Sequence, residues 1–125
     1  MASLREKIEA DDFVVGIVGL GYVGLPLALE FAKAGVRVIG LDVIEEKVAE
    51  IAAGRSYVGD VPSEELAPLV NEGLIEATAD FDRLAECDVI SVCVPTPLGK
   101  TKDPDLSFVL SAMEDVTERL RPGQL

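Results

Sequence analysis

Three glycines at positions 19, 21 and 24 stand at the G-x-G-x-x-G spacing, directly after an apolar run that begins near residue 14. In a dinucleotide-binding turn Gly19 permits the tight turn, Gly21 leaves room for a pyrophosphate, and Gly24 lets the following helix pack close to the strand. The start of that helix offers unpaired N–H groups and the positive end of its dipole, which favour an anion. The spacing therefore predicts a phosphate-binding turn between a strand and a helix.

An acidic residue, Asp42, ends the next apolar run about 20 residues after the turn, as the dinucleotide fingerprint requires. Its carboxylate is expected to accept hydrogen bonds from the adenosine ribose hydroxyls and to repel the 2′-phosphate of NADP, so NAD is the expected cofactor. Two alternatives stay open, namely glycines that serve only the turn and an Asp42 that only caps the next helix. Lys47, one turn into that helix, could reach the ribose or a phosphate, or could simply be solvated.

A third candidate contact follows a later apolar run, which stops abruptly at a proline. Val94, Pro95 and Thr96 come at the carboxyl end of an expected parallel strand, and such folds bind ligands at this edge of the sheet. Thr96 could offer its hydroxyl or its backbone to the nicotinamide ribose. The alternative is a loop that two prolines stiffen and that contacts no ligand.

The composition argues against several classes of partner. The 125 residues include 11 basic and 23 acidic side chains, and the net charge of −12 repels nucleic-acid phosphates and anionic membrane surfaces. Histidine is absent, and Cys87 and Cys93 fit neither a C-x-x-C pair nor a metal site, so no metal is expected and both are interpreted as small buried thiols. The uncharged stretch 13–29 is too short and too rich in glycine to span a membrane, and the N-terminus is unlike a secretory signal, so we expect a cytoplasmic protein.

Strands and helices alternate along the chain after a polar N-terminal extension. Residues 1–12 are expected to be frayed or briefly helical, and residues 13–125 to form one NAD-binding domain. Continuous apolar runs are typical of parallel strands covered on both faces, and such runs lie at 14–19, 36–41 and 89–94. The other expected elements are helices at 22–34, 44–53 and 63–72, a short strand at 75–79, a short helix or turn at 81–86, and a final helix that Pro122-Gly123 ends.

The helices carry recognisable start and stop signals. Gly35 and Gly54 are expected to end the first two helices, Ser63 to cap the third and Asp105 to cap the last. The side chains expected to face the core are Leu25, Ala28, Leu29 and Ala32 in the first helix and Ile44, Val48 and Ile51 in the second.

This alternation predicts an α/β fold, a Rossmann-type doubly wound parallel sheet with helices on both faces. Another strand should follow the last helix, but the sequence ends at Leu125, so we expect a domain that is truncated before its later strands. The strand at 89–94 should then have an exposed apolar edge that pairs with a second chain, which predicts a homo-oligomer.

Five runs of residues together resemble the N-terminal NAD-binding domain of the UDP-glucose/GDP-mannose dehydrogenase family. They are Gly-Leu-Gly-Tyr-Val-Gly-Leu-Pro-Leu-Ala at 19–28, Gly-Leu-Asp-Val with Lys47 at 40–47, Gly-Arg-Ser-Tyr at 54–57, Cys-Asp-Val-Ile-Ser-Val-Cys-Val-Pro-Thr-Pro at 87–97 and Asp-Pro-Asp-Leu-Ser at 103–107. The resemblance covers almost the whole chain after residue 12. Within the family, Pro-Thr-Pro-Leu at 95–98 followed by Asp-Pro-Asp-Leu-Ser is more similar to the UDP-N-acetylhexosamine 6-dehydrogenases than to the UDP-glucose enzymes.

The resemblance implies an NAD-dependent enzyme that oxidises the C6 alcohol of a UDP-sugar to a carboxylate in two steps. By residue match, Tyr22 and Val23 would lie along the pyrophosphate, Asp42 and Lys47 at the adenosine ribose, and residues 94–96 beside the inner half of the cofactor. The family's catalytic cysteine and the residues that assist it belong to motifs beyond position 125. No catalytic residue is therefore expected in this chain, which alone should lack catalysis.

Two other functions remain open from the sequence. A 3-hydroxyacid-type dehydrogenase has a similar opening domain but does not need a downstream cysteine. A non-catalytic nucleotide-binding or assembly module could keep the same fold without serving any reaction.

Overall fold

The computed structural model describes residues 3–100, 103 and 105–125. In chain order its elements are α1 (Leu4–Glu9), β1 (Val14–Val18), α2 (Gly24–Lys33), β2 (Arg37–Leu41), α3 (Glu45–Ala52), α4 (Ser63–Asn71), β3 (Ile75–Thr78), η1 (Phe81–Glu86), β4 (Val89–Val92) and α5 (Ser107–Arg119). All the expected strands and helices are present, and the N-terminal extension contains one short helix. Among the described residues, no helix is long and apolar enough to cross a bilayer.

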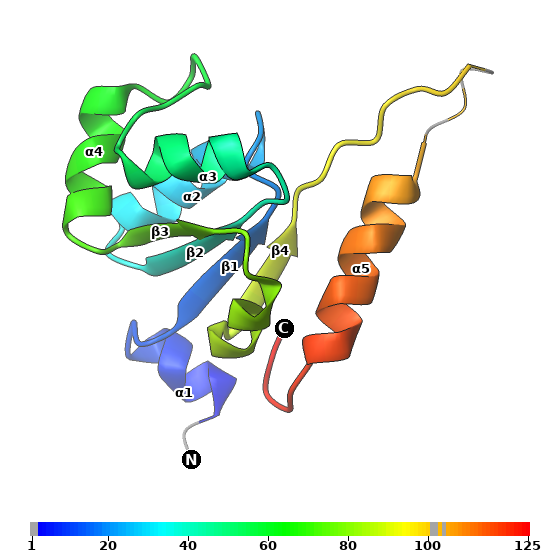
Figure 1. Ribbon diagram of the computed structural model, residues 1–125. Helices are drawn as coiled ribbons and strands as arrows, with labels where there is room; N and C mark the ends of the chain where they lie inside the picture. Colours follow the sequence, from blue (N-terminus) through cyan, green and yellow to red (C-terminus); the bar gives the residue numbers. More distant parts are fainter. Residues whose placement is uncertain (1–2, 101–102, 104) are drawn as a thin grey trace.

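The four strands form one parallel sheet in the order β3-β2-β1-β4 (Figure 1). The apolar runs of β1 and β2 are buried along four of their five residues, as continuous hydrophobic strands in a sheet covered on both faces require. After β3 the chain returns past β1 to form β4 on the opposite side, so the strand order reverses between β1 and β4. Ligands bind at such a reversal in open α/β sheets.

Helices cover both faces of the sheet. One core contains Val15 and Ile17 of β1 together with the inner residues of α2, α3 and α4. The other core contains Val18 of β1 with Leu84 of η1 and the buried residues of α5. The predicted doubly wound arrangement is confirmed, and the predicted inner face of the first helix is buried in full.

Two predicted helix caps are wrong. Pro62, not Ser63, occupies the position before α4, and the Ser63 hydroxyl accepts a hydrogen bond from the Ser56 N–H at 3.0 Å instead. Leu106, not Asp105, precedes α5, while the Asp105 carboxylate accepts a hydrogen bond from the Ser107 N–H at 2.9 Å. Short polar side chains near a helix start have several backbone donors within reach, so sequence alone does not choose among them.

Other boundaries shift by one or two residues. The first helix begins at Gly24 and the strand near 89–94 ends at Val92. Ile44, expected to face the core, precedes α3 and is 43% exposed. Gly35 and Gly54 end their helices with φ angles of 87° and 76°, which confirms their predicted role because glycine adopts positive φ without a Cβ clash.

The outer edge of β4 is not fully open. The Leu125 N–H donates to the backbone oxygen of Asp88 at 3.0 Å, and the Ile90 N–H donates to the backbone oxygen of Leu125 at 2.7 Å. Leu125 therefore pairs beside the start of β4 (Figure 1). The expectation of a wholly exposed edge is wrong at these first residues. Pairing of the remaining edge with a second chain stays a prediction.

Asp88 is a buried carboxylate at the end of the sheet opposite the glycine turn. The sequence assigned it no role. Asp88 is 5% exposed, and it accepts hydrogen bonds from the Val14 N–H and from Lys7 of α1, both at 2.9 Å, and a longer one from Arg121 at 3.4 Å. Burial by itself raises the pKa of the Asp88 carboxyl, but the hydrogen bonds from Lys7 and the Val14 N–H outweigh it and hold this pKa below its ordinary value. Asp88 thus joins both ends of the chain to β1.

We expect Asp88→Ala to lower the free energy of unfolding by about 2 kcal/mol, because it leaves three part-buried donors, the Val14 N–H and the Lys7 and Arg121 side chains, without their partner. The lowered pKa means that the Asp88 contribution is complete above the unfolded pKa of about 3.9 and is lost as pH falls through the folded pKa. Urea unfolding at pH 7 and at acid pH measures both effects.

Asp82→Ala is the matched control, because it also removes an aspartate that pairs with an arginine. The Asp82–Arg119 distance is 3.0 Å, but the Asp82 side chain is 81% exposed. Such a pair contributes less than about 1 kcal/mol. An equal loss in the two variants would contradict the role assigned to Asp88.

Candidate nucleotide-binding site

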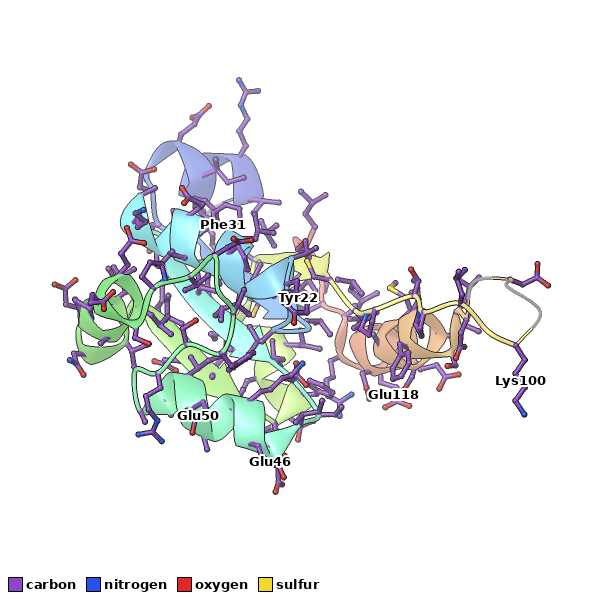
Figure 2. All side chains as sticks on the ribbon, turned by 90° about the horizontal axis from the view of Figure 1, so that it is seen from above. Tyr22, Phe31, Glu46, Glu50, Lys100 and Glu118 are labelled. Atoms are coloured by element: carbon purple, nitrogen blue, oxygen red, sulfur yellow. The ribbon has the colours of Figure 1, made fainter. Side chains whose placement is uncertain are left out.

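A cleft of about 560 Å³ opens at the carboxyl ends of β1, β2 and β4, where the strand order reverses, and α5 forms its far wall. Its lining residues are 18–23, 41–44, 47, 81, 93–95, 108, 111, 112 and 115. Figure 2 looks down on the molecule from above, with Tyr22 near the centre and Lys100 at the outer tip of the loop that follows β4. The predicted turn, Asp42 and Lys47 therefore meet in one cavity.

The three glycines of the turn are needed for different reasons. Gly19 has a φ of 99°, and a Cβ there would lie 2.6 Å from the Cys93 oxygen; a Cβ on Gly24 would lie 1.8 Å from the Gly19 oxygen. A Cβ on Gly21 would meet no atom within 4 Å, so the space beside it is open. Tight approach at Gly19 and Gly24 with open space at Gly21 fits a turn that must accept a pyrophosphate.

The start of α2 is electrostatically suited to an anion. The first turn of α2 contains no acidic residue, and no side chain caps it. In the described part of the chain, the N–H of Gly21 meets no hydrogen-bond acceptor. A free N–H near the positive end of a helix dipole attracts a phosphate group.

Asp42 lies at the end of β2 and is 8% exposed. One of its oxygens accepts a hydrogen bond from the Leu20 N–H and the other from the Ile44 N–H, both at 2.9 Å. The second bond resembles the capping role that the sequence left open. A carboxylate has about four acceptor sites, so two remain for hydroxyl donors in the cleft. Capping and ribose binding are therefore compatible at Asp42.

Lys47 and the turn are linked by an aromatic residue to which the sequence assigned no role. The Lys47 ammonium lies 5.7 Å from the centre of the Tyr57 ring, and the Tyr57 hydroxyl donates to the Leu20 oxygen at 2.5 Å. Burial, with the nearby Asp42 charge, raises the pKa of the Tyr57 hydroxyl. The sequence gives no direct signal for the Tyr57–Leu20 contact, because the two residues are 37 positions apart. The only sequence feature that marks this loop is the Gly-Arg-Ser-Tyr run at 54–57.

The remaining predicted contacts divide into two groups. Tyr22 and Val23 border the cleft and are exposed, Tyr22 to 82%, and Val94 and Pro95 line its inner side. Thr96 is exposed and does not line the cleft, since β4 ends at Val92 and the chain has left the sheet before it reaches Thr96. The apolar wall provided by Phe108 and its neighbours on α5 was not predicted, because helical periodicity does not show which outer residues border a ligand.

The two cysteines differ in their surroundings. Cys87 is buried under Gly16, and burial raises the pKa of its thiol to about 11, so this residue is an unreactive core side chain as predicted. Cys93 is only half-buried and lines the cleft, which corrects its interpretation as a small buried thiol. In the described ranges, no three Cys, Asp or Glu side chains lie close enough together to hold a metal.

A doubly wound sheet, a glycine turn with an open face and an acidic residue ending the next strand together define a dinucleotide-binding domain. Residues 13–125 match the family described as UDP-glucose/GDP-mannose dehydrogenase, NAD binding domain. The chain belongs to this family, which confirms the resemblance seen in the sequence, and NAD is the cofactor of the matched domain.

Known members are similar in sequence and in structure. The UDP-N-acetyl-D-glucosamine 6-dehydrogenase of Pseudomonas aeruginosa is 37% identical over 114 residues, covering 91% of this chain and 26% of that protein. The structure of GDP-mannose dehydrogenase from the same species superposes with a TM-score of 0.82 at 32% identity, covering 86% of this chain and 25% of that one. The structure of NDP-N-acetyl-D-galactosaminuronic acid dehydrogenase from Methanosarcina mazei superposes with a TM-score of 0.85 at 29% identity, covering 100% of this chain and 29% of that one. The chain thus spans about a quarter of the length of its relatives.

Proposed function

We propose that this chain holds NAD in the cleft at the carboxyl edge of its sheet and is the cofactor-binding part of a nucleotide-sugar 6-dehydrogenase. The observation that carries the proposal is the open face of Gly21, whose free N–H adjoins the start of α2. The substrate class, a UDP-N-acetylhexosamine, is supported by the names of relatives at 33 to 37% identity.

Each cleft residue has a proposed task. The turn with Gly19, Gly21 and Gly24 accommodates the pyrophosphate, with Tyr22 and Val23 beside it. Asp42 and Lys47 hold the adenosine ribose, and Val94 and Pro95 adjoin the inner half of the cofactor. Thr96 remains a candidate contact on the exposed loop that follows.

Bound NAD supplies the acceptor for the hydride that leaves the sugar C6 during oxidation. The residues of this chain bind and orient that acceptor, and none is proposed to react with the sugar. We therefore expect no turnover of UDP-sugar by these 125 residues alone.

We further propose a cytoplasmic homo-oligomer that does not bind nucleic acid. The net charge of −12 supports the last point, because it repels phosphate backbones. Among the described residues, no strand covers the β4 edge beyond the Leu125 contact, and this edge supports the proposed oligomer.

Isothermal titration of the chain with NAD, NADP, ADP-ribose and FAD tests the proposed function. We expect NAD and ADP-ribose to bind and NADP to bind at least about ten times more weakly, because the Asp42 charge repels a 2′-phosphate. Absence of binding to all four would support an assembly module, and tighter binding of NADP would contradict the role of Asp42.

Asp42→Asn is expected to reduce the discrimination between NAD and NADP to about twofold, because the repelling charge is lost. The variant should also lose about 1 kcal/mol of stability, since an amide NH₂ would face one of the two N–H groups that Asp42 accepts from. Titration and thermal unfolding measure the two effects. Discrimination unchanged from the parent chain would show that Asp42 does not set it.

A further inference from the structure

The peptide groups around Leu20 are held from two sides in the glycine turn. The Leu20 N–H donates to Asp42 at 2.9 Å, and the Leu20 oxygen accepts from the Tyr57 hydroxyl at 2.5 Å. Asp42 comes from the end of β2, whereas Tyr57 comes from the loop between α3 and α4. Two separate parts of the chain therefore fix the orientation of this segment of the turn.

The Tyr57 contact determines where the next N–H points. In a planar trans peptide the C=O and the following N–H point in opposite directions. Because the Leu20 oxygen is directed to Tyr57, the Gly21 N–H is directed away from Tyr57. Gly21 lines the cleft, a Cβ built on it would meet no atom within 4 Å, and in the described chain its N–H has no acceptor.

We propose that Tyr57 is a positioning residue for the anion-binding turn: its hydroxyl holds the Leu20–Gly21 peptide so that the Gly21 N–H faces the dinucleotide pyrophosphate. This inference rests on the proposed binding of NAD in the cleft. Without the hydroxyl, that peptide can rotate, and the Gly21 N–H must be reoriented whenever the ligand binds. The Tyr57 hydroxyl is protonated at neutral pH, as any tyrosine with an ordinary pKa of about 10 is, and it can therefore donate; burial raises this pKa further.

The Tyr57 ring has a second contact that the hydroxyl does not provide. The Lys47 ammonium lies 5.7 Å from the ring centre, within range of a cation–π interaction, and Lys47 also lines the cleft. Tyr57→Phe keeps the ring beneath Lys47 and removes only the hydroxyl. The substitution therefore separates the effect on the turn from any effect on Lys47.

The test compares ADP-ribose, which contains a pyrophosphate, with adenosine, which has none, by NMR titration of the 125-residue chain. For Tyr57→Phe we expect the affinity for ADP-ribose to fall about five- to tenfold, the amount that one lost hydrogen bond produces. The affinity for adenosine should stay within about twofold, because Asp42 and Lys47 are unchanged. The Gly21 amide signal should show a smaller response to ADP-ribose than in the parent chain.

Ser56→Ala is the matched control in the same loop, since the Ser56 hydroxyl donates to the Val58 oxygen and does not contact the turn. It should leave both affinities unchanged. An equal loss for adenosine and ADP-ribose in Tyr57→Phe, or no loss for either, would overturn the proposal. If the parent chain itself does not bind ADP-ribose, the proposed function fails together with this inference; if it binds and Tyr57→Phe binds equally well, only the inference fails.

Discussion

Gly21→Val is expected to remove most NAD binding while the fold stays intact. The Cβ would enter space that holds no protein atom within 4 Å, and the Gly21 φ lies outside the left-handed region, so the folded chain accepts a side chain there. The same space is where we place the pyrophosphate, and a branched side chain would keep it away from the free N–H groups. We expect a loss of about 100-fold in affinity, or about 2.7 kcal/mol, measured by titration with NAD.

Gly59→Val provides the control for Gly21→Val. Gly59 also has open space around its missing Cβ and also lies outside the left-handed φ region, but it does not line the cleft. It should keep both the melting temperature and the affinity for NAD. If Gly21→Val bound NAD as tightly as Gly59→Val, the pyrophosphate would not lie over Gly21.

Gly24→Ala is expected to have the opposite outcome, a loss of stability that precedes any effect on the ligand. The new Cβ would lie 1.8 Å from the Gly19 backbone oxygen and 3.2 Å from the Ile17 side chain, so β1 and α2 would have to separate. Overpacking against backbone at this distance should lower the free energy of unfolding by about 3 kcal/mol. The melting temperature of a chain this size would then fall by roughly 12 °C or more.

Gly21→Ala is the matched comparison for Gly24→Ala, because the same methyl group is added three residues earlier in the same motif. It should leave the melting temperature close to that of the parent chain. Alanine is the better helix former by about 1 kcal/mol, so an uncrowded Gly24 would give a more stable variant. A higher melting temperature for Gly24→Ala would contradict the close packing of α2 on the turn.

Much of the fold could be predicted because its signals are local. Continuous apolar runs mark β1 and β2 as buried strands, and the spacing from Leu25 to Ala32 marks the inner face of α2. The turn and Asp42 could be predicted to lie together, as they do in the cleft, because the task proposed for them depends on glycine and carboxylate chemistry at a fixed spacing. Such features require no knowledge of which distant residues meet.

The features that escaped prediction depend on contacts between distant parts of the chain. Asp88 gains its partners only when α1, β1 and the C-terminal turn converge, and Tyr57 meets Leu20 only after α3 has folded back. The position of Thr96 depends on the direction in which the chain leaves β4. Loop direction is set by packing rather than by residue type.

Asp42 links two properties that would otherwise evolve separately. The carboxylate that we propose repels a 2′-phosphate also accepts the Leu20 N–H and so shapes the turn. A lineage that acquired NADP by replacing Asp42 with a residue that carries no acceptor would lose an anchor of its own phosphate-binding turn. Such a change of cofactor therefore weakens the turn in the same step, unless a second substitution supplies a new acceptor for the Leu20 N–H.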